Sequence, residues 1–341
     1  MRQITFPKEF RPDTCEPSCD NAGAWADHSP TWSPDGKKIA FIRIAGIGKD
    51  AGDYGERGHD IFVTTPVGGG AQRLTAVTDT GIHNGLAWSP DGTRLLFTRI
   101  HQGKMALWTA AADGTDQKRL LPEHAEPHFD GHWSPDGKRI VYVYDRLQGT
   151  DGKLQINHCA ADGSDDRVLI PHKAFEESPR WSPDGKRVLW VSTRDKNPEL
   201  YTVTADGKDI KRLTNEVAYD LHPAWSPDGK HIAFASGRTG RQKLYVMNAD
   251  GTGTRKLTEG DGLDAWPVWS PDGKRIAFVS HRTGNYDIWL VNADGTGLRN
   301  LTAHPAADTS PAWSPDGKRL AFVSTRGGAC DIYVLPVEPL P

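Results

Sequence analysis

Short hydrophobic runs separated by turn-forming residues recur along the whole chain. Typical runs are residues 275–280 (Arg-Ile-Ala-Phe-Val-Ser), 287–292 (Asp-Ile-Trp-Leu-Val-Asn) and 298–302 (Leu-Arg-Asn-Leu-Thr). Runs of this length are too short for helices and are rich in β-branched and aromatic residues, so we expect strands buried on both faces. The pattern therefore predicts an all-β protein.

The motif Trp-Ser-Pro-Asp-Gly punctuates this pattern seven times. Its copies begin at Trp32, Trp88, Trp133, Trp181, Trp225, Trp269 and Trp313, with spacings of 56, 45, 48, 44, 44 and 44 residues. In such a turn Pro presets φ, Asp caps neighbouring backbone and Gly accepts a positive φ. Each repeat supplies four short strands, and four strands in a unit of this length are typical of a β-propeller blade. We predict a seven-bladed β-propeller that spans residues 1–341 as a single domain.

The seventh repeat lacks a fourth strand after its third hydrophobic run. Other repeats end in a segment such as residues 255–258 (Arg-Lys-Leu-Thr), and the segment most like it outside the repeats is residues 2–5 (Arg-Gln-Ile-Thr). We therefore expect residues 2–6 to complete the last blade. Such closure would remove the exposed sheet edge that an open array presents.

Composition and charge narrow the classes of function. A net charge of −3, with Lys and Arg spread evenly along the chain, offers no basic stripe for a phosphate backbone, so we do not expect nucleic acid as a partner. No stretch approaches the roughly 18 apolar residues that span a bilayer, and the first residues form no secretory apolar segment. We expect a monomeric globular protein without a membrane span.

The repeat at residues 308–322, followed by Asp-Ile-Tyr at 331–333, resembles the TolB-type β-propeller repeat. The resemblance covers nearly the whole chain and implies a propeller. Similar propellers serve as the periplasmic TolB partner of an outer-membrane lipoprotein, as gating domains of prolyl-oligopeptidase-type and tricorn proteases, and as the catalytic body of oligogalacturonate lyases. Fold does not choose among these activities. We expect neither the separate α/β domain of TolB nor a hydrolase domain within these 341 residues, which contain no Gly-x-Ser-x-Gly motif.

An ionisable residue stands five positions before each repeat Trp. These residues are Asp27, His83, His128, Glu176, Asp220, Asp264 and Asp308. Because alternate residues of a strand share a face, we expect this ring to continue inward through Asp130, Ser178, His222 and Trp266, then through His132 and Arg180. The predicted ligand-binding residues at the channel mouth are Asp27, His83, His128, Asp130, Glu176, Arg180, Asp220, His222, Asp264, Trp266 and Asp308.

A second ring of arginines follows the second strand of each repeat. Its members are Arg43, Arg99, Arg146, Arg194, Arg238, Arg282 and Arg326. One interpretation of the two rings is a structural network in which the acids pair with arginines. A second interpretation starts from the two histidines that replace acids in the ring. His83 and His128, together with Glu176 of the next blade, form a candidate site for a divalent metal ion, as lyases of similar fold imply.

Two functions follow from these patterns. The first is a binding scaffold that holds a protein segment or a small polar ligand at the channel mouth, on the face where loops vary in length and residue type. The alternative is a metal-assisted lyase or hydrolase acting on a sugar-like substrate, with His83, His128 and Glu176 as ligands or bases. The sequence does not decide whether the protein is an enzyme.

The cysteines and the first residues bear on location. Cys15 and Cys19 are close enough for a small disulfide, with free thiols or a metal site as alternatives, whereas Cys159 and Cys330 lie in different blades and are not expected to pair. The TolB resemblance implies the periplasm or the cell exterior if a signal peptide has been removed. Otherwise the first residues indicate the cytoplasm.

Overall fold

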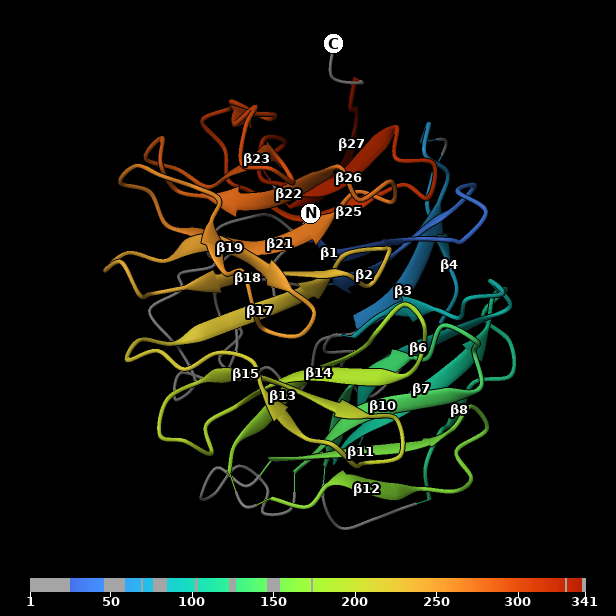
Figure 1. Ribbon diagram of the computed structural model, residues 1–341. Coiled ribbons are helices and arrows are strands. Elements are labelled where there is room, and N and C mark those ends of the chain that lie inside the picture. Colours follow the sequence, from blue (N-terminus) through green and yellow to red (C-terminus); the bar gives the residue numbers. More distant parts are fainter. Residues whose placement is uncertain are drawn as a thin grey trace.

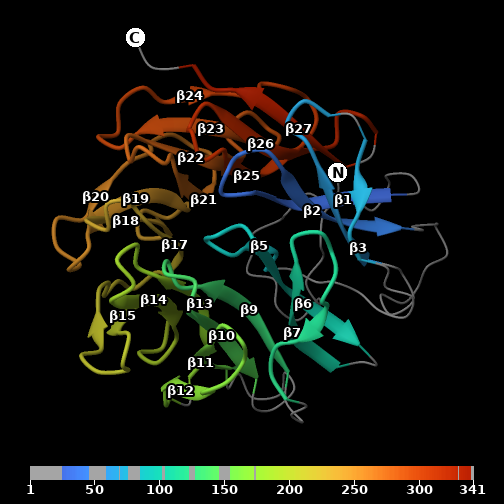
Figure 2. The same cartoon turned by 90° about the vertical axis from the view of Figure 1, so that its right-hand side faces the viewer.

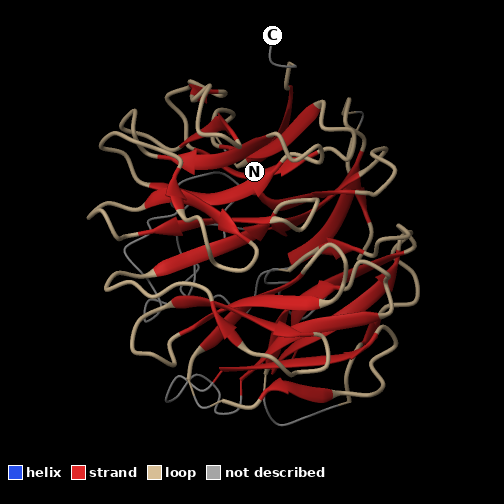
Figure 3. Ribbon diagram, in the orientation of Figure 1, coloured by secondary structure: helices blue, strands red, loops and turns tan. Residues whose placement is uncertain are grey.

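Every described element of the protein is a β-strand. The computed structural model describes residues 25–45, 59–68, 70–75, 85–101, 104–122, 127–145, 154–172, 174–328 and 330–338. Within these residues the strands form seven sheets arranged around one axis, which confirms the prediction of an all-β, seven-bladed propeller (Figures 1 and 3). No helix in the described ranges is long and apolar enough to cross a membrane.

Each blade is an antiparallel meander that runs outward from the axis. Blade one consists of β1 (Trp25–Trp32), β2 (Ile39–Ala45), β3 (His59–Thr64) and β4 (Gln72–Arg73), and blade two of β5 (Ala87–Trp88), β6 (Arg94–His101), β7 (Lys104–Ala111) and β8 (Lys118–Arg119). Blade three consists of β9 (His128–Trp133), β10 (Arg139–Asp145), β11 (Leu154–Ala160) and β12 (Arg167–Ile170), and blade four of β13 (Glu176–Trp181), β14 (Arg187–Ser192), β15 (Glu199–Thr204) and β16 (Lys211–Arg212).

The last three blades follow the same plan. Blade five consists of β17 (Asp220–Trp225), β18 (His231–Ser236), β19 (Lys243–Asn248) and β20 (Arg255–Lys256), and blade six of β21 (Asp264–Trp269), β22 (Arg275–Ser280), β23 (Asp287–Asn292) and β24 (Arg299–Asn300). Blade seven has three strands among the described residues, β25 (Asp308–Trp313), β26 (Arg319–Ser324) and β27 (Asp331–Pro336). Residues 2–6 lie outside the described residues, so their place as the fourth strand of blade seven stays a prediction.

The first and last blades meet and close the ring. Strand β1 packs against β25, β26 and β27 (Figures 1 and 2). The indole Nε1 of Trp32 donates to the carbonyl of Ala312 at 3.0 Å, and the amide of Asp27 donates to the carbonyl of Cys330 at 3.1 Å. Equivalent indole bonds join Trp88 to the carbonyl of Thr31, Trp269 to that of Ala224 and Trp313 to that of Val268, so four of the seven repeat tryptophans link neighbouring blades by a hydrogen bond.

The hydrophobic core lies between blades rather than inside any one of them. One cluster joins Leu244 and Val246 of blade five to Ile276 and Phe278 of blade six, and all four side chains are buried. Because each sheet buries both faces, its strands carry continuous apolar runs, which is the pattern that the sequence shows.

The Ser-Pro-Asp-Gly turn is held by its own side chains. In blade five, the Ser226 hydroxyl donates to Oδ1 of Asp228 at 2.6 Å and accepts from the amide of His231 at 2.9 Å. Gly229 has a φ of 69° and its amide donates to the Ser226 carbonyl. The Ser226 hydroxyl is also the main cause that lowers the pKa of Asp228. The turn chemistry predicted from the sequence is confirmed.

Among the described residues, a β-bulge interrupts the innermost strand of six blades. In β17, Leu221 lies opposite Ala235 and Ala224 lies opposite Ala233, so His222 and Pro223 together face a single residue of β18. The residue three positions before the repeat Trp, here called the bulge residue, has a positive φ in every blade. The values are 54° for Ser29, 70° for Gly85, 50° for Asp130, 54° for Ser178, 52° for His222, 51° for Trp266 and 51° for Ser310.

Because of the bulge, the side chains of the innermost strand do not alternate as the sequence predicted. Residues five and three positions before the Trp do not share a face, because the extra residue shifts the pleat between them. Asp220 is fully buried within its blade, whereas the bulge residue His222 is half-buried and the next residue, Pro223, is buried again. The bulge residues therefore line the central axis, and the acids that precede them do not.

The cysteines of the described residues do not pair with each other. Cys159 is a free, buried thiol, and Cys330 is disulfide-bonded. This agrees with the expectation that the two lie too far apart to be joined. Cys15 and Cys19 lie outside the described residues.

Candidate functional site

The acids that stand five positions before the repeat Trp, here called the acids of the outer ring, pair with the predicted arginines. Arginine nitrogen to carboxylate oxygen distances are 2.5 Å for Arg43–Asp27, 2.9 Å for Arg194–Glu176, 2.8 Å for Arg238–Asp220, 2.7 Å for Arg282–Asp264 and 2.7 Å for Arg326–Asp308. Each of these arginines also lies over aromatic rings of its own blade, as Arg238 does over Phe234 and Tyr245.

These ion pairs belong to the interior of each blade. The carboxylates are 0% to 3% exposed, so a ligand in the channel would not reach them without displacing an arginine. Burial is the largest influence on Asp220 and raises its pKa to about 6 in spite of Arg238. The geometry supports the structural-network interpretation for Asp27, Glu176, Asp220, Asp264 and Asp308.

Two of the three proposed metal ligands, His128 and Glu176, are engaged by the protein itself. Nδ1 of His128 accepts the amide of Leu107 at 2.9 Å, while Glu176 accepts from the Trp190 indole, the Ser192 hydroxyl and Arg194. The Glu176 carboxylate is therefore already paired with a cation, Arg194. No group of three or more His, Cys, Asp or Glu within the described ranges is arranged to hold a metal ion. His83 lies outside those ranges, so its part in a metal site stays a prediction.

The bulge residues differ around the axis. Blades one, two and seven carry Ser29, Gly85 and Ser310 there, whereas blades three, five and six carry Asp130, His222 and Trp266. Strands β9, β13, β17 and β21 pack side by side. The large polar and aromatic side chains therefore gather on one side of the channel, along blades three to six, and we call this the polar wall.

An ion pair bridges two blades of the polar wall. Nη1 of Arg180 lies 3.2 Å from Oδ1 of Asp130 and also donates to the carbonyl of Pro179 at 2.8 Å. Burial, together with the positive charge of Arg180, lowers the pKa of His132 to about 3, so this imidazole is neutral. The sequence prediction placed Asp130, Arg180 and His132 near the channel, and the structure brings them together.

Glu177 is the acid that sequence reasoning missed. It directly precedes the bulge residue Ser178, and burial, followed by repulsion from Asp130, raises its pKa to about 7. Within the described residues its carboxylate has neither a hydrogen bond nor an ion pair. A signal was present, because only this repeat has an acid four positions before its Trp. The corresponding residues are His28, Asn84, Phe129, Leu221, Ala265 and Thr309.

Two aromatic side chains complete the polar wall. The rings of His222 and Trp266 lie with centroids 5.0 Å apart and planes tilted by 35°. Burial lowers the pKa of His222 to about 4, so it too is neutral. A bulky residue at positive φ costs of the order of 1–3 kcal/mol, and such cost concentrates at functional positions. Blades one, four and seven meet the same backbone requirement with serine.

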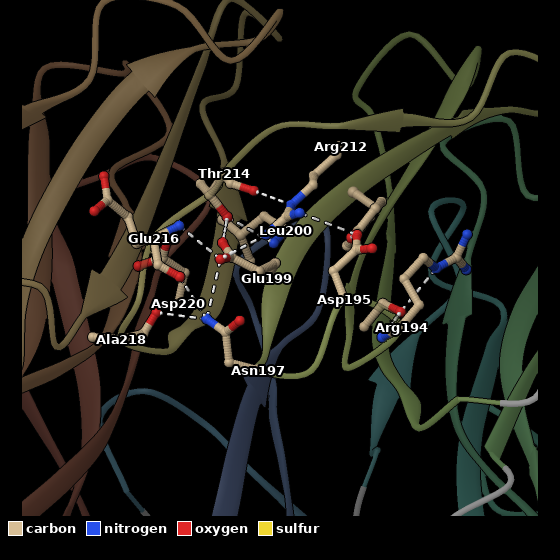
Figure 4. Close-up of polar contacts among 12 residues, drawn as sticks. Arg194, Asp195, Asn197, Glu199, Leu200, Arg212, Thr214, Glu216, Ala218 and Asp220 are labelled. Carbon is tan, nitrogen blue, oxygen red and sulfur yellow. Dashed lines mark hydrogen bonds and ion pairs between the residues drawn. The ribbon is translucent and has the colours of Figure 1, made fainter.

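A second polar cluster lies at the loops between blades four and five (Figure 4). Glu199 is fully buried and accepts from Thr214 Oγ1 at 2.5 Å, Arg212 Nη2 at 3.1 Å and the amide of Glu216 at 2.7 Å. Asn197 donates to Glu199 at 3.1 Å and to the carbonyl of Ala218 at 2.9 Å. Since both carboxylate oxygens are used inside the cluster, it holds the loop that leads from blade four to blade five against β15 and leaves Glu199 no free oxygen for a ligand.

Comparison with known proteins gives the family and the fold. The profile described as TolB beta propeller domain matches residues 133–267 and 252–339, more than half of the chain. A Tol-Pal system protein TolB of Anaeromyxobacter dehalogenans is 40% identical over 141 residues, which are 41% of this chain and 30% of that protein. The chain spans less than half the length of the curated relatives that it matches first.

Two solved structures share the architecture. An oligogalacturonate lyase in complex with manganese has a TM-score of 0.74 at 16% identity, covering 93% of this chain and 94% of that one. A structure described as a putative TolB from Agrobacterium tumefaciens has a TM-score of 0.56 at 24% identity, covering 79% of this chain and 95% of that one. At such identities the likeness shows the propeller fold and leaves function to the site.

Proposed function

Since the chain belongs to the TolB beta propeller domain family, we infer that it acts as a binding scaffold that holds a protein segment or a small polar ligand in its central channel. Asp130, Arg180, His222 and Trp266 supply the contacts. The acids of the outer ring hold the blades in shape instead of meeting the ligand.

One observation carries this proposal, namely the asymmetry of the bulge residues. A ring that only had to be stable would be served by the same small residue in each blade. Blades one, four and seven have serine at this point, but blades three, five and six have Asp130, His222 and Trp266 in the same backbone conformation. Variation on a repeated scaffold, at a backbone cost, is the expected mark of a binding surface.

We propose the periplasm or the cell exterior as its location. The disulfide at Cys330 supports an oxidising compartment, because disulfides seldom persist in a reducing cytosol. Relatives described as Tol-Pal system proteins support the same choice.

The proposal is tested by placing serine, the bulge residue of blades one, four and seven, at the bulge positions of the polar wall. A variant with Asp130→Ser, His222→Ser and Trp266→Ser keeps a residue type that already occupies this conformation at Ser29, Ser178 and Ser310. We expect ligands found for the wild type, by thermal shift with a metabolite library and by binding to a peptide array, to bind this variant at least about tenfold more weakly.

The matched control removes three exposed lysines from the opposite face. Lys138→Ser, Lys230→Ser and Lys274→Ser change residues next to Ser-Pro-Asp-Gly turns, whose backbone bonds do not need the lysine side chain. This control is expected to bind as the wild type does. Equal binding by the polar-wall variant and the wild type would contradict the proposal.

The alternative function is a metal-assisted lyase or hydrolase. The observation that favours it is the similarity of fold to a lyase in complex with manganese. Elemental analysis of protein purified without chelator separates the two. For a binding scaffold we expect no stoichiometric metal in the wild type, even after incubation with manganese. Stoichiometric manganese that is lost in His83→Ala/His128→Ala would reverse the order of the two functions.

A further inference from the structure

Three arginines of the protein show what the slots between blades can hold. Successive strands of a blade are antiparallel, so the Ser-Pro-Asp-Gly turns and the turns after the third strands share one end of the ring, here called the turn face. On this face Arg139 of blade three lies over the indole of Trp181 in blade four, with Cζ 4.6 Å from the ring centroid. It also donates to the carbonyl of Ala205 at 3.2 Å. Arg275 and Arg319 lie in the same way over the repeat tryptophans of blades seven and one, so a slot between two blades accommodates a guanidinium group.

Two neighbouring slots of the turn face are hollow. The slot between blades one and two has a volume of about 410 Å³ beside Trp88 and Ala112, and the slot between blades two and three has a volume of about 470 Å³ beside Trp133 and Ala161. These alanines stand where Ala205 stands in blade four, because each donates its amide to the carbonyl of the residue after the turn glycine of its own blade. The hollow slots therefore present the same groups as the slot that Arg139 fills.

The residue that would fill each hollow slot is either a lysine or an arginine held elsewhere. Blade one has Lys38 at the position of Arg139, and its ammonium makes no ion pair within the described part of the chain. Blade two has Arg94 at this position, but its guanidinium pairs with Asp116 of its own blade at 2.8 Å. Each slot thus has its tryptophan and its space but lacks the arginine.

The two hollow slots share the carboxylate of Asp91, which lines both of them. Its Oδ1 accepts from the Ser89 hydroxyl at 2.6 Å and from the amide and hydroxyl of Thr93 at 3.0 and 2.8 Å, while Oδ2 has no partner among the described residues. A lysine follows the Gly of the six other Ser-Pro-Asp-Gly turns, as Lys37 does 3.4 Å from Asp35, but blade two has Thr93. The charge of Asp91 is therefore open to a cation from outside.

A guanidinium group matches the walls of both slots. It is planar and stacks on an indole, and its several N–H groups can meet carbonyl and carboxylate oxygens at the same time. Besides lying over the repeat tryptophan of blade seven, Arg275 donates to the carbonyl oxygens of Glu338 at 3.0 Å and Gly317 at 3.4 Å. The counterparts of this glycine in the hollow slots are Gly92 and Gly137.

We propose that the two hollow slots bind two arginine side chains of a protein segment, one over Trp88 and one over Trp133, with Asp91 as the carboxylate that both share. Because the slots are neighbours on one face, a single segment can occupy both, and two linked contacts bind more tightly than either alone. This site is separate from the polar wall and does not depend on the channel function.

The probes are N-acetyl-arginine amide, its neutral isostere N-acetyl-citrulline amide and a set of peptides with two arginines at varied spacing. Protein labelled with 5-fluorotryptophan reports binding by fluorine NMR, with resonances assigned from Trp88→Phe and Trp133→Phe. We expect both resonances to shift with arginine amide, with a Kd at least about threefold lower than for citrulline amide. The best two-arginine peptide should bind at least about tenfold more tightly than the single amide.

Lys38→Arg tests the site by filling the first slot from within. The turn after the third strand of blade one, residues 65–71, contains no aspartate that could hold the new guanidinium as Asp116 holds that of blade two. We expect the Trp88 resonance to stop responding to arginine amide and the Trp133 resonance to respond as before. The control Lys37→Arg changes the exposed neighbour and should leave both responses unchanged.

Thr93→Lys tests the role of the shared carboxylate. It gives blade two the lysine of the other six turns, so arginine amide should bind at least about threefold more weakly at both slots. Near-ultraviolet circular dichroism of each variant checks that the fold is kept.

Several results would overturn the proposal. Equal binding of arginine and citrulline amides would do so, and so would a Trp88 resonance that still responds in Lys38→Arg. Two-arginine peptides that bind no more tightly than the single amide would overturn the assignment to a protein segment. The channel function is judged separately by the serine variant of the polar wall, so the two proposals fail independently.

Discussion

Replacing Arg238 with methionine is expected to lower the free energy of unfolding by about 3–5 kcal/mol at pH 8. The guanidinium lies 2.8 Å from Asp220, whose carboxylate is fully buried, and it also donates to the Ser236 hydroxyl at 2.8 Å. Methionine keeps much of the packing over Phe234 but leaves a buried charge without its cation. Urea denaturation at pH 8 measures the loss.

The pH dependence identifies the cause of that loss. In the wild type the pKa of Asp220 is already raised from its usual 3.8 to about 6. Ionisation of Asp220 therefore lowers the free energy of unfolding as pH rises from about 4 to 6. Without Arg238 the pKa rises further, and the added loss should shrink at pH 5.5, where the carboxyl takes up a proton. The double variant Arg238→Met/Asp220→Asn should recover most of the stability at pH 8.

A matched substitution excludes a general effect of losing an arginine from this loop. Arg241 is exposed three residues further along, and Arg241→Met is expected to change the free energy of unfolding by less than about 0.5 kcal/mol. An Arg238→Met protein as stable as Arg241→Met at pH 8 would show that the buried pair does not stabilise the blade.

Glu177→Gln is expected to raise the free energy of unfolding by about 1–3 kcal/mol at pH 8. The pKa of Glu177 is about 7 in the folded protein and 4.5 when unperturbed. Because the folded state holds the proton more tightly, the wild type loses stability as pH rises from about 4.5 to 7 and the loss is complete above that. Glutamine has the same shape and carries no charge, so it escapes this loss.

Chemical denaturation at pH 4.5 and pH 8 checks both the size and the sign. The two proteins should differ little at pH 4.5, where Glu177 is protonated in the folded state and about half protonated in the unfolded state, and should diverge as pH rises. Glu259→Gln, at an exposed position, should follow the wild type at both values. A glutamine variant less stable than the wild type at pH 8 would mean that the carboxylate has a stabilising partner.

The number and plan of the blades could be predicted from the sequence because both depend on contacts between residues that are close in the sequence. Each Ser-Pro-Asp-Gly turn closes through contacts within five residues, as between Ser226 and His231, so the motif marks the same turn wherever it occurs. The apolar runs between turns then assign the strands.

The candidate site was harder to predict, since it depends on one extra residue per strand. Period-two alternation placed Asp220 and His222 on one face, but the bulge separates them and sends the acid into the blade. No residue type in a sequence such as Asp-Leu-His-Pro predicts the positive φ that the histidine adopts. Glu177 was overlooked because the acid beside it, Glu176, satisfied the pattern.

The bulge also bears on how such a ring can diverge. Most packing between blades is carried by residues on either side of the bulge, although the bulge residue Trp266 also packs against the hydrophobic cluster of blades six and seven. Serine, glycine, aspartate, histidine and tryptophan all occupy the bulge position in this one chain. Each blade therefore contributes one position that selection can alter separately, and seven such positions around one axis allow new recognition properties to arise by single substitutions that leave the architecture unchanged.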